Sequence, residues 1–304
     1  MEELWERSIP IINITIEDIK IIFNKLINNI EIIEYNLVTI GCRNSNYIVN
    51  TNKGDFFIRF TPKDSQGYKN ELRSYIILKD KINIPAPIKV GSYNNRTYII
   101  YECIKGISLY NVEINKKIIE KVAEDLAKVH NIQEEEYSKF DLFRYPPFES
   151  WFDLFLNNEY AYERLGSKLV DRIKYLLMDK EEEIKTIDLY KSYIHSDFRP
   201  INMMINNNGE IYYVDWEFSN YGHILGDIGQ FFRYDELFSK DKILLFEAKY
   251  NEVSKVKLPY NWFELAKLRD LINPLQLLGD KEDSPNKYRD LKHLVNKTMA
   301  FFNY

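Results

Sequence analysis

Residues 193–232 constrain the fold of this chain more than any other stretch. Three polar residues, Asp197, Asn202 and Asp215, stand there in an otherwise apolar sequence. Two short apolar segments flank Asn-Asn-Asn-Gly at 206–209, which is typical of a strand–turn–strand hairpin. Such a hairpin brings its two ends together, so Asn202 would lie beside Asp215. Two carboxylates and an amide oxygen that converge at one point suit Mg²⁺ together with phosphate.

The motifs of this stretch resemble those of a known family. The sequence reads H-S-D-F-R-P-I-N at 195–202, V-D-W-E at 214–217 and G-D-I-G at 226–229. In this order and spacing it is similar to the aminoglycoside phosphotransferase / choline kinase family, a small-molecule branch of the protein-kinase-like fold. The resemblance covers residues 37–232 by motif and the rest of the chain by general pattern.

The resemblance implies a role for each polar residue of the stretch. Asp197 is expected to be the catalytic base, because a carboxylate can orient an attacking hydroxyl and accept its proton. Asn202 and Asp215 are expected to be Mg²⁺ ligands. His195 is expected to fix the loop through hydrogen bonds, and Asp227 to hold the loop backbone, so both are predicted to be structural.

The N-terminal third of the chain carries the expected nucleotide site. A loop between two predicted strands resembles the nucleotide-covering loop of the family, although by itself it also fits a plain β-turn. The chain has neither a Walker loop nor a Rossmann fingerprint. Arg59 lies in an apolar strand and needs a partner, for which Glu71 in the next helix is the candidate. The residues expected to bind ATP or GTP are Gly41, Asn44, Ser45, Asn46, Arg59 and Glu71, with Glu102, Cys103 and Ile104 at a hinge.

Composition limits the function classes. The chain has 304 residues, a net charge of −5 and no long basic run, which argues against nucleic acid as a partner. Cys42 and Cys103 show no metal-binding or redox spacing. The sequence shows no signal peptide and no apolar run long enough to span a membrane, so a cytoplasmic protein without a membrane partner is expected.

The resemblance implies the fold class, and hydrophobic periodicity places the helices. We expect an α+β protein with a two-lobed, protein-kinase-like fold. The N-terminal lobe, residues 1–104, should contain an antiparallel sheet, and the C-terminal lobe, residues 105–304, should be mainly helical. Helices are predicted at 14–30, 68–78, 115–131, 151–160, 169–184, 237–250, 262–278 and 288–302.

The acceptor is the least constrained part of the prediction. A small, cationic acceptor is expected from the acidic chain and the resemblance, with an aminoglycoside, and hence antibiotic resistance, as the first choice. The candidate contacts are Glu217, Asp235, Glu236, Glu264 and Asp270.

Three alternatives remain open at this point. Choline, ethanolamine, homoserine or a sugar would suit the same chemistry. A kinase-like module could bind nucleotide without turnover. A metal phosphohydrolase could be built on His195, Asp197 and Asp215, although four scattered histidines supply few ligands for one.

Overall fold

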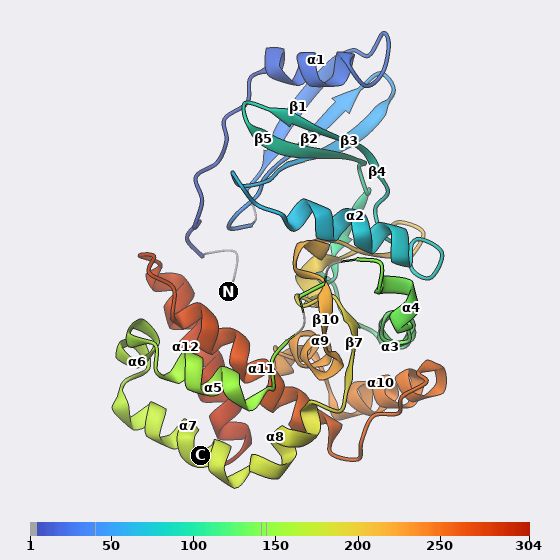
Figure 1. Ribbon diagram of the computed structural model, residues 1–304. Helices are drawn as coiled ribbons and strands as arrows, with labels where there is room; N and C mark the ends of the chain where they lie inside the picture. The colour runs from blue at the N-terminus through green and yellow to red at the C-terminus, as the bar shows by residue number, and fades with distance from the viewer. Residues whose placement is uncertain (1–4, 40, 141, 144) are drawn as a thin grey trace.

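The computed structural model describes residues 5–39, 41–140, 142–143 and 145–304. It has a smaller N-terminal lobe built on a sheet and a larger, mainly helical C-terminal lobe (Figure 1). The predicted α+β, two-lobed architecture is therefore confirmed. None of the helices in the described ranges combines the length and apolar character needed to cross a membrane.

The N-terminal lobe is organised around one antiparallel five-stranded sheet in the order β1-β2-β3-β5-β4. One helix packs on the sheet and a second lies between the sheet and the C-terminal lobe (Figure 1). The elements are α1 (Ile16–Asn24), β1 (Ile32–Val38), β2 (Ser45–Thr51), β3 (Gly54–Phe60), α2 (Gly67–Leu78), β4 (Pro87–Tyr93) and β5 (Arg96–Glu102).

Helix α1 begins where the sequence predicts and ends earlier. The Thr15 side chain accepts a hydrogen bond from the Asp18 backbone, and the Asp18 carboxylate accepts one from the Thr15 backbone, so a capping box fixes the start. The helix ends at Asn24, and the later Asn29 adopts a positive φ of 56° that an α-helix does not allow. The apolar residues after Asn24 therefore continue the packing but not the helix.

The C-terminal lobe contains ten helices among the described residues, two small sheets and several 3₁₀ turns. Its elements are β6 (Gly106–Ser108), η2 (Leu109–Asn111), α3 (Lys116–His130), α4 (Glu134–Tyr137), α5 (Glu149–Leu156), α6 (Glu159–Leu165), α7 (Ser167–Asp179), α8 (Glu181–Ile187), β7 (Lys191–Ile194), η3 (Pro200–Asn202), β8 (Met203–Asn206), β9 (Ile211–Tyr213), η4 (Trp216–Phe218), β10 (Asn220–His223), α9 (Ile224–Phe231), η5 (Asp235–Leu237), α10 (Lys240–Val253), α11 (Trp262–Leu278) and α12 (Pro285–Phe301). Strands β6, β8 and β9 form one sheet, and β7 pairs with β10.

Two predicted helices are each divided in the structure. The helix expected at 151–160 is split between α5 and α6, because the Asn158 side chain accepts hydrogen bonds from two backbone amides and starts a new helix. The helix expected at 169–184 is interrupted at Lys180, which ends α7 and precedes α8. Hydrophobic periodicity continued across both breaks, so it could not reveal them.

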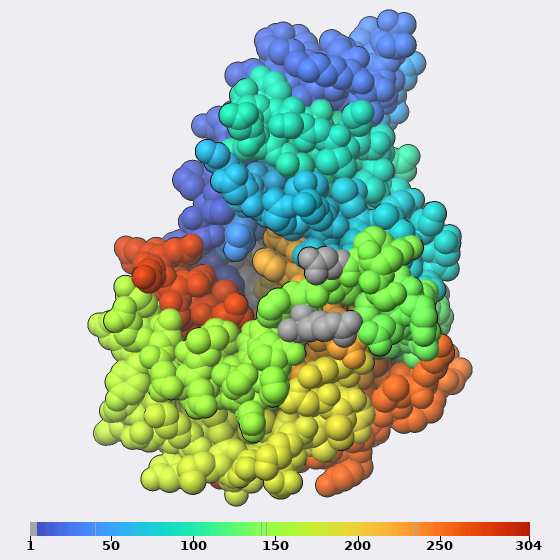
Figure 2. Space-filling model, viewed as in Figure 1, coloured from blue at the N-terminus to red at the C-terminus, as the bar shows by residue number. Residues whose placement is uncertain are grey.

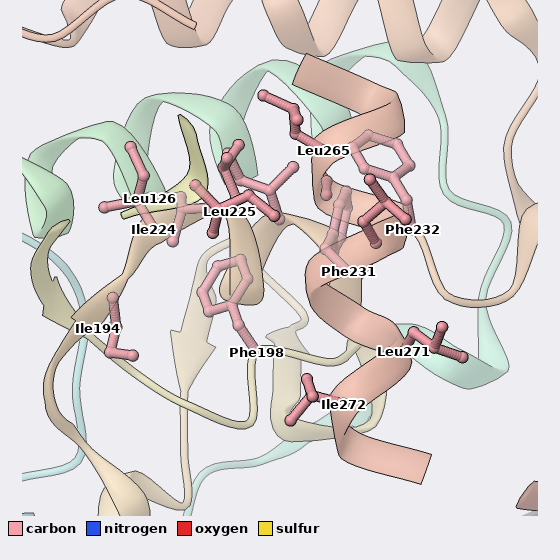
Figure 3. Close-up of a cluster of buried hydrophobic side chains, with 14 of the residues drawn as sticks. Leu126, Ile194, Phe198, Ile224, Leu225, Phe231, Phe232, Leu265, Leu271 and Ile272 are labelled. Atoms are coloured by element: carbon pink, nitrogen blue, oxygen red, sulfur yellow. The ribbon is translucent and has the colours of Figure 1, made fainter. Parts of the chain in front are cut away.

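The central stretch is anchored in the core of the C-terminal lobe. Phe198 is buried and stacks on Tyr213 with ring centroids 5.5 Å apart, and it lies 6.1 Å from the ring of Phe231 in α9. Figure 3 shows Phe198 pointing into a cluster that also contains Leu225 and residues of α11. The aromatic side chain fixes the loop next to Asp197 against a rigid core.

Candidate active site

The predicted hairpin is present and closes the site from one side. Strands β8 and β9 pair antiparallel, and the Val214 amide donates to the Asn202 carbonyl at 3.0 Å. This backbone bond places Asn202 beside Asp215, although they are thirteen positions apart. At the turn, Gly209 has a φ of 80°, a conformation that favours glycine.

Asp197 is held by an unusually complete set of donors. Arg199 donates to both carboxylate oxygens, at 2.6 Å from Nε and 2.8 Å from Nη2, and Asn202 Nδ2 donates to Oδ2 at 2.8 Å. Although burial alone would raise it, the Arg199 guanidinium holds the pKa of Asp197 below its usual value. Asp197 is therefore ionised at neutral pH, as a proton acceptor must be.

The loop that carries Asp197 is fixed by hydrogen bonds from α9. Asp227 accepts from the backbone amides of His195 and Ser196, both at 2.8 Å. Gln230 accepts from the Phe198 amide and donates to the Ser196 carbonyl, also at 2.8 Å. Because Ser196 has a φ of 68°, these bonds hold a backbone conformation that a serine would otherwise leave.

Both ring nitrogens of His195 are used inside the protein. Nδ1 accepts from the Asp197 amide at 3.2 Å, and Nε2 lies 3.0 Å from the Val214 carbonyl, to which it donates. The imidazole therefore joins the loop of Asp197 to the strand that precedes Asp215. This arrangement leaves neither nitrogen free to take a substrate proton.

Arg59 connects the N-terminal lobe to the central stretch. It forms a buried ion pair with Glu71 of α2 and donates to Asp215 Oδ1 at 2.8 Å. Burial would lower the pKa of Arg59, but the charges of Asp215 and Glu71 raise it well above the usual value, so the guanidinium stays charged. Its Nε is buried and has no hydrogen-bond partner among the described residues.

The loop predicted to cover the nucleotide lies next to Arg59. Asn44, Ser45 and Asn46 are buried, and the Oδ1 atoms of both asparagines lack a partner among the described residues. Ser45 Oγ accepts from the Ile12 amide at 2.9 Å, so this hydroxyl is occupied within the lobe. Gly41 is exposed with a φ of 110° and has open space around its Cα.

The predicted hinge joins β5 to β6. Its central residue, Cys103, donates its amide to the Asp55 carbonyl at 3.0 Å, so this N–H is engaged within the lobe. Glu102 ends β5 and is exposed. We therefore expect Glu102 and Ile104, and not the Cys103 amide, to bind the nucleotide base.

Glu217 is buried at the junction of the two lobes. Asn44 Nδ2 donates to its Oε1 at 3.3 Å, and its carboxylate lies against Gly67 at the start of α2. Burial, followed by the negative charge of Asp215, raises the pKa of Glu217 to about 7. Glu217 therefore lies beside the loop predicted to cover the nucleotide.

The raised pKa predicts a pH-dependent effect of Glu217→Gln on stability. Ionised Glu217 disfavours the folded state, and this cost is absent below the unfolded pKa of 4.5 and complete above about 7. We therefore expect Glu217→Gln to match wild type near pH 4.5 and to be more stable by on the order of 2 kcal/mol at pH 8. Thermal unfolding across this pH range measures the difference. Glu163→Gln, which changes an exposed carboxylate, should give no pH-dependent difference, and a flat difference for Glu217→Gln would contradict the prediction.

The other acidic candidates lie in different surroundings. Glu236 is ion-paired with Lys297 at 2.7 Å, and Glu264 is exposed in the first turn of α11, where its charge acts on Lys180. Asp270 is buried and binds Arg233 through two hydrogen bonds of 2.7 and 2.9 Å. The prediction for Asp235 concerns a side chain outside the described part of the structure.

The structure also adds residues that sequence reasoning did not select. Gln230 holds the loop of Asp197 by accepting a hydrogen bond from it. Burial raises the pKa of Asp197, and Arg233 is one of the positive charges that lower it, with a smaller effect than Arg199. Gln230 stands three positions after Asp227, so it shares a helix face with that residue. That spacing was a usable signal, whereas nothing in the sequence marks Arg233 as a neighbour of Asp197.

A divalent cation fits the site only if phosphate oxygens and water complete its coordination. Both hydrogen bonds of the Asn202 amide use Nδ2, so its Oδ1 faces away from Asp197. Asp215 is 28% exposed at its side chain, and its Oδ2 has no contact with Arg59. The described residues contain no group of three or more His, Cys, Asp or Glu that would hold a metal alone. One carboxylate and one amide oxygen suit a cation completed by phosphate oxygens and water.

The surface is hollowed between the two lobes. Figure 2 shows this hollow bordered by α12 in red, by the N-terminal lobe in blue and cyan, and by green residues below. The gold colour of the central stretch is visible inside it.

Comparison with known proteins places the chain among phosphotransferases. Residues 34–250 match the model of the phosphotransferase enzyme family. No curated protein matches the chain. Among solved structures, a spectinomycin phosphotransferase is similar with 16% identity and a TM-score of 0.67, covering 92% of this chain and 96% of its own.

Two further solved structures come from other substrate classes. A choline kinase from Streptococcus pneumoniae is similar with 17% identity and a TM-score of 0.65, covering 94% of this chain and 98% of its own. A microcompartment-associated aminopropanol kinase has 16% identity and a TM-score of 0.67, covering 95% of this chain and 96% of its own. At such identities these structures show the fold, which extends over both lobes.

Proposed function

Because the chain belongs to the phosphotransferase enzyme family, a family of small-molecule kinases that use a nucleotide, we propose that it moves the γ-phosphoryl group of ATP or GTP to a hydroxyl group. The observation that carries this proposal is the convergence of Asp197, Asn202 and Asp215 with Arg59 at the hollow between the lobes. Solved relatives of the same fold hold ADP or AMP-PNP.

Each residue of the site has a separate role in the proposed phosphoryl transfer. Asp197 orients the acceptor hydroxyl and takes its proton as the oxygen attacks phosphorus. Arg59, held by Glu71 and Asp215, places a positive charge beside the site proposed for the phosphates. Oδ1 of Asp197 accepts one hydrogen bond, from Arg199 Nε, so its second lone pair can accept the proton of the hydroxyl while Arg199 holds the carboxylate in place.

Mg²⁺ is the cation that the site would accept. Asn202 Oδ1 and Asp215 Oδ2 would hold it, and its charge would offset the negative charge of the nucleotide phosphates. Glu102 and Ile104 would meet the base through the backbone, which leaves the choice between ATP and GTP to small differences in the hinge.

The acceptor is a small molecule. We propose further that this molecule is an aminoglycoside. Its support is that similar solved structures contain spectinomycin and hygromycin B. Choline kinase and aminopropanol kinase are similar to the same extent, and both of their named substrates are amino or ammonium alcohols. The buried Arg233–Asp270 pair argues against a strongly acidic pocket around Asp270, since the charge of this carboxylate is already neutralised by a guanidinium.

Turnover assays test the proposal. ATP and GTP, each with Mg²⁺, are offered with aminoglycosides, choline, ethanolamine, aminopropanol, homoserine and sugars, and nucleoside diphosphate release is measured. Acceptor-dependent release supports a small-molecule kinase and names the acceptor class. Nucleotide binding without turnover on any acceptor would favour a silent module, whereas absence of nucleotide binding would refute the kinase proposal. Phosphate release that needs no nucleotide binding would favour the phosphohydrolase, which the two engaged nitrogens of His195 disfavour.

A further inference from the structure

Residues 5–9 lie along the open side of the molecule and contact both lobes. On the C-terminal side, Trp5 Nε1 donates to Asp290 of α12 at 3.1 Å. Glu6 accepts from the backbone amides of Asn286 and Lys287, at 3.1 and 3.2 Å. These are first-turn amides of α12, for which the N-cap residue provides no side-chain hydrogen bond. Glu6 therefore takes the place of a missing cap.

On the side of the N-terminal lobe, Arg7 binds the loop predicted to cover the nucleotide. Arg7 donates from Nη1 to the Gly41 carbonyl and from Nη2 to the Asn44 carbonyl, the latter at 2.7 Å. The amides of Ser8 and Ile9 both donate to the Cys42 carbonyl, at 3.1 and 3.2 Å. Three carbonyls of one short loop thus point toward residues 7–9.

The direction of these carbonyls matters for an anionic ligand. A carbonyl oxygen turned toward a phosphate would repel it, whereas a backbone N–H would attract it. By holding the oxygens of Gly41 and Asn44, Arg7 keeps them directed toward itself. Gly41 has a φ of 110° and open space where a side chain would lie, so its carbonyl is held by Arg7 and not by side-chain packing.

We propose that residues 5–9 are a strap between the lobes, in which Arg7 is a positioning residue for the nucleotide loop and Glu6 anchors the strap on α12. The inference rests on the proposed function, because the loop has to meet a nucleotide. In Figure 1 the strap descends from α1 toward the upper end of α12, and both border the hollow seen in Figure 2. The strap therefore connects the helix on one side of the hollow to the loop on the other.

The first test compares Arg7→Ala with wild type in nucleotide binding. We expect the Kd for Mg²⁺–AMP-PNP, measured by calorimetry, to rise about tenfold, since two charge-assisted hydrogen bonds to the loop are lost. The KM for nucleotide should rise with it, while kcat and the KM for acceptor change less than about twofold. Arg7→Lys should give an intermediate Kd, because a single ammonium nitrogen keeps the charge but does not reproduce the two-nitrogen geometry of the guanidinium.

The second test asks whether the strap acts as one unit. Glu6→Ala should raise the nucleotide Kd about threefold, and adding it to Arg7→Ala should cause no further loss, since Arg7 no longer transmits the anchor. Arg96→Ala removes an arginine from the β4–β5 hairpin of the same lobe and serves as the matched control, with wild-type Kd expected. Hydrogen exchange of amides 41–46 should become faster in Arg7→Ala without nucleotide.

The outcomes separate the strap from the proposed function. Wild type that binds AMP-PNP, with Arg7→Ala binding equally well, overturns the strap even if the variant melts at a lower temperature. Additive effects of Glu6→Ala and Arg7→Ala overturn the continuous strap. Wild type that binds no nucleotide overturns the proposed function, and the positioning role of Arg7 is refuted with it.

Discussion

Asp197→Asn is expected to lower kcat by about 10³-fold and to leave the Kd of Mg²⁺–AMP-PNP within about threefold of wild type. Asparagine keeps the shape of aspartate and can still accept from Arg199, but it cannot take a proton from the acceptor hydroxyl. Both Arg199 and Asn202 donate to the Asp197 carboxylate, which holds it in the position proposed for the base. The measurement is steady-state turnover with the best acceptor, together with nucleotide binding.

The control for this variant is Asp241→Asn, which changes an exposed carboxylate in the first turn of α10. Wild-type kcat is expected for it. If Asp197→Asn kept more than about a tenth of the wild-type kcat, another group would be the base. If the variant lost nucleotide binding as well, Asp197 would be acting mainly through the metal or the loop backbone, and the assignment as base would be refuted.

Asp215→Asn is expected to lower kcat/KM for the nucleotide by about 100-fold or more, with a weaker dependence on Mg²⁺. Asp215 has a φ of 67° in the left-handed region, which asparagine also tolerates, so the backbone should be kept. The substitution removes the negative charge that both a cation and Arg59 would share. Turnover is measured as a function of Mg²⁺ concentration, and saturation should need several-fold more metal than in wild type.

The thermal stability of Asp215→Asn separates a ligand role from a structural one. Arg59 keeps Glu71 as its partner, so the variant should unfold near the wild-type temperature. The removed charge is also one of the causes that raise the pKa of Glu217, which should fall toward its usual value in the variant. An unchanged Mg²⁺ dependence with normal stability would rule out Asp215 as the metal ligand.

The hairpin and its motif residues could be read from the sequence because their causes are local. The turn at 206–209 follows from asparagine and glycine chemistry, and period-2 apolar residues gave β8 and β9. Because burying an unpaired charge is costly, Arg59 was expected to have an acidic partner, and Glu71 lies in the next helix. Helix α11 has the predicted bounds because a long run of apolar periodicity is the strongest sequence signal.

The acidic acceptor candidates show where local reasoning ends. Glu236, Glu264 and Asp270 lie on helices whose rotation and packing decide which groups they face. Packing turned Asp270 onto Arg233 and Glu264 toward Lys180, and it buried Glu217 between the lobes. No feature within a few residues of these carboxylates could have indicated those partners.

By itself the sequence determined the fold class and the family. It also predicted the residues proposed to carry phosphoryl transfer, because spacing within one hairpin and one loop sets their separation. Only the tertiary structure decided how these groups are restrained: Arg199 on Asp197, α9 under the loop, and Arg7 on the nucleotide loop from 34 positions away. The physical reason is that a hydrogen bond or ion pair depends on distance in space, and the burial that sets its strength exists only after both lobes have packed.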